Sequence, residues 1–152
     1  MSRVKPIRFT VTQNGSEKVY GGKPQTVRFR VWPTQAHMLV DAYGCDVAGI
    51  DDDTVGVTIC EDDKGRYVDG SWRAKHKKHG ATIYLTSSWL KMSVLSHEVS
   101  HATIGLLRRS LGWDFPLGAA PGDNEEAVCY VLGDLLASSM QSLREHGLVF
   151  RA

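Results

Sequence analysis

The chain reads TIYLTSSWLKMSVLSHEVSHATIGL at residues 82–106. Residues 82–86 are rich in β-branched and aromatic side chains, a composition that predicts a strand. Residues 89–111 contain no proline, and their apolar residues recur at the i, i+4, i+7 and i+11 positions of one helix face. These positions are Leu95, Val99, Ala102 and Leu106. The segment therefore predicts a strand followed directly by a long amphipathic helix.

His97 and His101 stand four residues apart in this expected helix, so their side chains share one face. They point roughly opposite to the apolar stripe, which argues against positions in the core. Two imidazoles so placed can bind one metal ion, and Glu98 is close enough to reach a water molecule held by that ion. The H-E-x-x-H spacing indicates a zinc hydrolase site with Glu98 as general base. The plainer alternative is a polar helix edge that carries two histidines by chance.

A catalytic zinc ion takes three protein ligands and keeps one position open for water. Residues 121–136, PGDNEEAVCYVLGDLL, predict a second helix, because a Pro-Gly pair breaks the chain and Asp123 can cap a helix that begins after it. Glu125 lies near the edge of the apolar face of this helix, whereas Glu126 is rotated further away and has capping-box spacing from Asp123. We therefore assign Glu125 as the third ligand and Glu126 as the cap. Alternatively, both are acids favoured at a helix start by the dipole. The apolar face comprises Val128, Val131, Leu132 and Leu135.

This arrangement resembles the gluzincin zinc metallopeptidases, the group that contains thermolysin and the zinc aminopeptidases. In that group the second helix often opens with Asn-Glu, and in the aminopeptidase branch an aromatic residue follows five positions after the Glu. Asn124-Glu125 and Tyr130 stand at these places. The resemblance covers about residues 81–136 and is greatest to compact single-domain gluzincins, including small phage-type and ImmA-like metallopeptidases. It implies a zincin-like fold, one zinc ion per chain and a protein or peptide substrate.

Two features depart from the thermolysin pattern. The interval between His101 and Glu125 holds 23 residues, a little more than in thermolysin. Cys129 stands where thermolysin-like enzymes place an aspartate that orients a histidine, so another group, such as Asp134 or a backbone carbonyl, must hold the rings. Cys129 also lies one turn past Glu125. A thiolate there can close the fourth metal position, which leaves open the alternative of a non-catalytic zinc module that regulates or stabilises.

The resemblance further implies a substrate-binding strand. In gluzincin-like folds a strand just before the metal-binding helix forms the rim of the cleft and pairs with an extended substrate. By that resemblance, Ile83, Tyr84, Leu85 and Thr86 are expected to offer main-chain hydrogen bonds to a peptide. The alternative is an ordinary sheet strand that packs on the helix. Tyr130 points far around its helix from Glu125, so we expect a core or surface aromatic rather than an oxyanion-stabilising group.

The amino half is rich in strand patterns. Residues 7–12 and 26–32 alternate apolar and polar side chains, and residues 55–60 predict a further strand. Between them, Thr34 can cap a short helix over residues 35–43 that stops at Gly44. Because strands gather in the amino half and helices in the carboxyl half, the expected class is α+β, with a small twisted sheet packed against the zinc-site helix and a second C-terminal helix.

The length of 152 residues predicts a single domain over residues 1–152. The 18 Lys and Arg against 17 Asp and Glu give a net charge of +1, which does not favour nucleic acid as a partner. Residues 73–79, RAKHKKH, are expected to form an exposed basic loop without a stacking platform. Three widely spaced cysteines, no apolar leader and no run long enough to span a membrane predict a cytoplasmic protein. The oligomeric state stays open.

Overall fold

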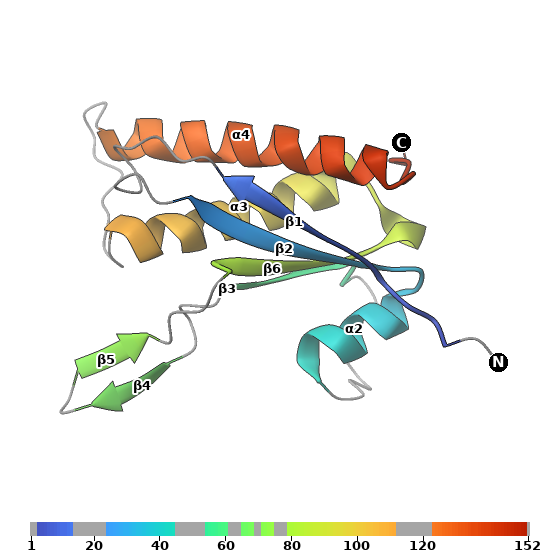
Figure 1. Cartoon of the computed structure of the whole chain (residues 1–152), viewed down its shortest axis with the longest axis horizontal. Helices are drawn as coiled ribbons and strands as arrows, with labels where there is room; N and C mark the ends of the chain where they lie inside the picture. The colour runs from blue at the N-terminus through green and yellow to red at the C-terminus, as the bar shows by residue number, and fades with distance from the viewer. Residues whose placement is uncertain are drawn as a thin grey trace.

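The computed structural model describes residues 3–13, 24–44, 54–60, 65–68, 71–74, 79–111 and 123–151. Strands dominate the first part of the chain and two long helices the last (Figure 1). The strands are β1 (Ile7–Gln13), β2 (Gln25–Trp32), β3 (Gly56–Cys60), β4 (Gly65–Val68), β5 (Ser71–Ala74) and β6 (Ala81–Thr86). The α-helices are α2 (Gln35–Tyr43), α3 (Met92–Leu111) and α4 (Asp123–Glu145), and a 3-10 turn, η2 (Ser87–Trp89), joins β6 to α3.

Strands β1, β2, β6 and β3 form one mixed sheet, in that order. β1 and β2 are antiparallel, β2 and β6 are parallel, and β3 runs antiparallel to β6 along the sheet edge. β4 and β5 form a separate two-stranded sheet. Helices α2, α3 and α4 pack against the mixed sheet, so the fold class is α+β, as predicted from the segregation of strands and helices.

The core lies between the sheet and the pair α3 and α4, which lie side by side on one face (Figure 1). The sheet contributes alternate residues of β2 and β6, because successive side chains of a strand point to opposite faces. The predicted stripe on α3 is confirmed, since all four of its residues are completely buried. On α4, Val131 and Leu135 are buried, and Val128 and Leu132 are partly buried against the same cluster.

Helix α2 covers part of the opposite face of the sheet. Its predicted bounds are confirmed: Thr34 accepts a hydrogen bond from the backbone N–H of His37, and Gly44 ends the helix in the left-handed conformation at φ 75°. Met38 and Leu39 pack on Tyr84 of β6. The helix contacts β2, β6 and β3, while the side chains of β1 on this face are exposed.

Residues 71–74 belong to β5, so the prediction of a basic loop over residues 73–79 is wrong at residues 73 and 74. Residues 75–78 lie outside the described ranges. None of the helices in the described part of the chain combines the length and the apolar character that a membrane span requires.

Candidate metal centre on helix α3

His97 and His101 form an exposed pair on α3, on the side away from the buried stripe. Their Nε2 atoms lie 3.1 Å apart and their rings meet edge to face, at an interplanar angle of 79°. Two nitrogens bound to one tetrahedral zinc ion at roughly 2.0–2.1 Å lie about 3.3 Å apart. The two nitrogens therefore already have nearly the separation that one shared ion requires.

Glu98 is buried, with 5% of its surface exposed, although it neighbours an exposed histidine. The Thr58 hydroxyl donates to Glu98 Oε2 at 2.6 Å and lies 3.0 Å from the backbone carbonyl of Glu98. The Glu98 carboxylate passes close to Gly56, where a Cβ would lie only 2.9 Å from Oε1. Thus the strand β3 holds this carboxylate in place, and only a glycine fits at position 56 without displacing it.

Alternate residues of β3 face helix α3. Gly56 and Thr58 contact Glu98, and the thiol of Cys60 donates to the backbone carbonyl of His101 at 3.6 Å. Gly105, one turn beyond His101, allows the close approach, since a Cβ there would clash with Cys60 Sγ. Sequence analysis missed these contacts. The one signal for them was a glycine within each element, which often marks a close approach of backbones.

A hollow of about 380 Å³ opens where the start of β3 meets α3. His97 and Glu98 line it from the helix, and Gly56 lines it from the strand. The remaining lining residues are Thr54, Val55, Ser93 and Val94. The hollow therefore brings the His97 imidazole and the buried Glu98 carboxylate to one small, partly apolar space.

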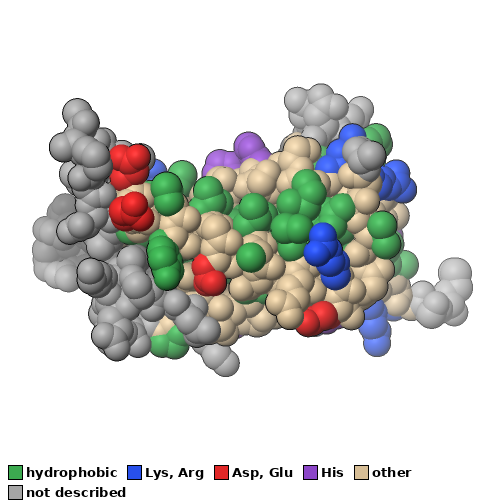
Figure 2. Space-filling model, turned by 90° about the horizontal axis from the view of Figure 1, so that it is seen from above, with side chains coloured by type: hydrophobic (Ala, Val, Ile, Leu, Met, Phe, Trp, Pro, Cys, Tyr) green, Lys and Arg blue, Asp and Glu red, His purple; other side chains and the backbone are tan. Residues whose placement is uncertain are grey.

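The proposed third ligand lies on the other helix. Glu125 and Glu126 are both exposed in the first turns of α4, and so are Cys129 and Tyr130. Among the described residues, no third histidine, cysteine or carboxylate joins the imidazole pair in a group that could hold a metal ion. In Figure 2, which views the molecule from the α4 side, histidine side chains emerge at one rim and carboxylates gather at the end where α4 begins. The structure thus unites His97, Glu98 and His101 but does not bring Glu125 to them.

The substrate strand expected at Ile83, Tyr84, Leu85 and Thr86 needs correction. These four residues form the end of β6, which pairs with β2 on one side and with β3 on the other. All four are buried. Ile83, Tyr84 and Leu85 are paired with a strand on each side, and Thr86 is paired with Trp32 of β2, so β6 is an internal strand and not an edge for a peptide. The strand that lies at the sheet edge beside the imidazole pair is β3 instead.

Comparisons with models of known protein families, with curated proteins and with solved structures found no match to this chain. Its function must therefore be inferred from the chemistry of the site.

Proposed function

We propose that this chain is a zinc-dependent metallopeptidase that hydrolyses peptide bonds. His97, His101 and Glu125 would hold the metal, and Glu98 would act as general base. The observation that carries the proposal is the pairing of the two Nε2 atoms at 3.1 Å beside a buried carboxylate. A polar helix edge that bears histidines by chance gives no reason for the adjacent carboxylate to be buried and hydrogen-bonded.

The donor set fits zinc in two of its three positions. Imidazole nitrogens are preferred zinc ligands, and a third ligand is needed to leave one position open. Glu125 would supply it from the first turn of α4 once this turn packs beside the imidazole pair. Glu125 is exposed, so its carboxylate can reach a metal ion without first leaving a buried contact.

When bound, zinc supplies an acidic water molecule and a positive charge that polarises a carbonyl oxygen. The protein would accept the proton of this water molecule on Glu98 and would hold the Glu98 carboxylate in a fixed position. The Thr58 hydroxyl occupies Glu98 Oε2, so Oε1 remains for the proton. Glu98 and His97 line the same hollow, so a water molecule held there by the metal would lie within reach of this carboxylate. Glu98 can then return the proton to the leaving amine.

The edge strand β3 is suited to hold the substrate. Within the described residues it pairs with β6 alone, so its other edge is free to pair with an extended peptide. Its Gly56 and Thr58 touch Glu98. A peptide added along this edge would therefore pass beside the catalytic carboxylate.

The test combines metal content with cleavage. The purified protein should contain about one zinc ion per chain and should cleave members of a mixed, fluorescence-quenched peptide library. Glu98→Gln should keep the zinc and lose about 10²- to 10⁴-fold in cleavage rate, because the base is gone while the ligands remain. Full cleavage by Glu98→Gln would exclude Glu98 as the base.

One observation favours a second candidate, a non-catalytic zinc module with a regulatory or structural role. The Thr58 hydroxyl is within hydrogen-bonding distance of both the side chain and the backbone carbonyl of Glu98. Such contacts also stabilise the packing of β3 against α3 without any catalytic role. In that case zinc would still bind, no library member would be cleaved, and Glu98→Gln would change only stability. The same pair of proteins therefore separates the two functions.

A further inference from the structure

The face of the sheet opposite α3 and α4 carries a group of cations at its β1–β2 end. Arg8 on β1 lies directly across from Arg30 on β2, and Arg28 lies two residues earlier on β2. All three point to the same side, because residues two apart on a strand share a face. Helix α2 covers the β6 and β3 end of this face, whereas Arg8 is exposed.

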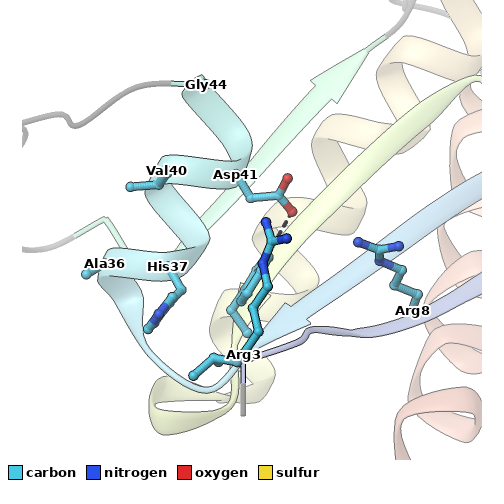
Figure 3. A pocket seen from close by; sticks show the side chains of 9 residues that line it. Arg3, Arg8, Ala36, His37, Val40, Asp41 and Gly44 are labelled. Carbon is cyan, nitrogen blue, oxygen red and sulfur yellow. Dashed lines mark hydrogen bonds between the residues drawn. The ribbon is translucent and has the colours of Figure 1, made fainter. Parts of the chain in front are cut away.

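Two adjoining hollows lie at this end of the sheet. One, of about 680 Å³, opens between β1, β2 and α2, and the other, of about 430 Å³, lies along the segment that leads into β1. Four residues line both hollows and separate them: Arg3, Val4, Arg8 and Trp32. In Figure 3, the guanidinium groups of Arg3 and Arg8 approach the space beside α2 from two sides.

Three cations that line the hollows, two of them in the shared wall, make no ion pair within the described part of the chain. Arg3, Lys5 and Arg8 make no ion pair there, and the one ion pair joins Arg30 to Asp41 at 2.8 Å. Asp41 also accepts a hydrogen bond from Trp32 Nε1 at 2.8 Å, so both of its oxygens are engaged. Cations without an ion-pair partner in the described residues therefore line both hollows, and Arg3 and Arg8 are common to the two.

Apolar side chains line both hollows, and Val4 and Trp32 are common to the two. The Trp32 ring stacks on His37 at a centroid distance of 5.6 Å, and both residues line the larger hollow. Val4 and Val40 add exposed apolar surface. A ligand complementary to this surface has two flat or apolar groups, one for each hollow, joined by an anionic group that contacts the arginines. A single nucleic acid strand has this pattern, because each phosphodiester joins two bases. An acidic polypeptide carries its charge at the ends of side chains instead.

We propose that this face binds single-stranded nucleic acid, with a phosphodiester at Arg3 and Arg8 and the flanking bases in the two hollows. Guanidinium groups are suited to phosphate oxygens, and aromatic side chains accept any base by stacking. The net charge of +1 does not favour such a partner, but the fold gathers cations around hollows whose one lining carboxylate, Asp41, is already paired with Arg30. The surface lies across the sheet from the imidazole pair, so it is independent of the proposed peptidase site.

The experiment measures the anisotropy of a fluorescein-labelled oligothymidylate of about 12 nucleotides. With phosphate contacts from Arg3, Lys5 and Arg8, raising salt from about 50 to about 200 mM should weaken binding about 20-fold. Arg8→Gln should bind about fivefold more weakly at low salt and should show only about a sevenfold salt effect. The matched control is Arg144→Gln, an exposed arginine on α4, which should bind like the wild type. EDTA should change nothing.

Three further measurements complete the test. An abasic strand of equal length and charge should bind at least about tenfold more weakly, because it cannot fill the hollows. Equal binding by the abasic strand, or equal binding by Arg8→Gln and the wild type, would overturn the proposal. So would polyglutamate that competes as well as the oligonucleotide at equal charge, since the surface would then fit an acidic polypeptide. Failure to bind the oligonucleotide at low salt excludes the site and leaves the peptidase proposal unaffected.

Discussion

Helices α3 and α4 make an instructive pair. Both are long and both bury one apolar stripe in the same core; α3 carries two of the three proposed metal ligands and α4 carries the third. They differ in what touches their polar residues. On α3, Glu98 is buried and bonded to Thr58, and the His101 carbonyl is bonded to Cys60. On α4, Glu125 is exposed.

The difference shows how a site residue is positioned. Spacing along one helix fixes His97 relative to His101, because both belong to the same rigid element. The placement of Glu98 is fixed by β3, which contacts α3 along its length. The placement of Glu125 depends on how one helix start meets another helix, and no local pattern determines that meeting. Substituting the ligands on α3 and on α4 one at a time therefore tests the two parts of the site separately.

The largest expected effect is loss of the metal. His97→Ala and His101→Ala should each reduce zinc from about one ion per chain to nearly none, because a two-ligand site binds weakly. Glu125→Ala should do the same if the start of α4 completes the site. Zinc content after dialysis, measured by elemental analysis, decides each case.

Two variants on α4 serve as controls for this series. Glu126→Ala should keep its zinc. Its free energy of unfolding should fall by only about 0.5–2 kcal/mol, because the substitution removes a helix-capping side chain. Cys129→Ser should also keep its zinc, since an open fourth position needs no thiolate. If Glu126→Ala loses its zinc and Glu125→Ala keeps it, the third ligand is Glu126 and not Glu125. Zinc lost with Cys129→Ser would favour the non-catalytic module.

The next effect concerns the link between β3 and α3. Thr58→Val keeps the shape of the side chain but removes the donor to Glu98 Oε2, leaving a buried carboxylate oxygen without its partner. The free energy of unfolding should fall by about 1–3 kcal/mol, measured by urea denaturation. Thr58→Ser restores the hydroxyl and should recover most of that loss. Equal stability of all three proteins would show that the helix alone holds Glu98.

Much of the fold could be predicted from periodicity. The alternation of residues 26–32 and the helical stripe of α3 each identify a buried face, and the start and stop residues of α2 define its ends. These patterns are local, so the sequence carries them in full. The pairing of strands is not local. Nothing in residues 82–86 marks β6 as an internal strand, and nothing in residues 55–60 marks β3 as the edge strand.

The site divides along the same line. The imidazole pair and Glu98 follow from spacing within one helix, and the structure brings them together as expected. Thr58 and Gly56 could not be found from the sequence, because they are 40 and 42 residues from Glu98 and meet it only through the antiparallel placement of β3. The cations around Arg8 could not be predicted for a similar reason. The net charge is a sum over the whole chain, whereas the fold brings particular cations together in space.

A smaller effect contrasts glycines within the two helices. In α3, a methyl group at Gly105 would clash with Cys60 Sγ, so Gly105→Ala must push β3 away from the helix. The crowding should cost about 1–3 kcal/mol, which exceeds the gain of about 1 kcal/mol in helix propensity. Adding Cys60→Ala should remove the contact with Sγ and recover most of the lost stability, although the Cβ of residue 60 stays 3.0 Å from the new methyl group. Purely additive effects in this double-mutant cycle would contradict the contact.

The smallest expected effect has the opposite sign. Gly133 lies at an exposed position within α4, and a methyl group there would meet no other atom within 4 Å. Gly133→Ala should therefore gain the helix propensity of alanine without any crowding, and should raise the free energy of unfolding by about 0.5–1 kcal/mol. Urea denaturation of the two glycine variants side by side measures the contrast. If Gly133→Ala also destabilises the protein, then this position of α4 is packed in solution. The contacts responsible would have to come from a part of the molecule other than α3.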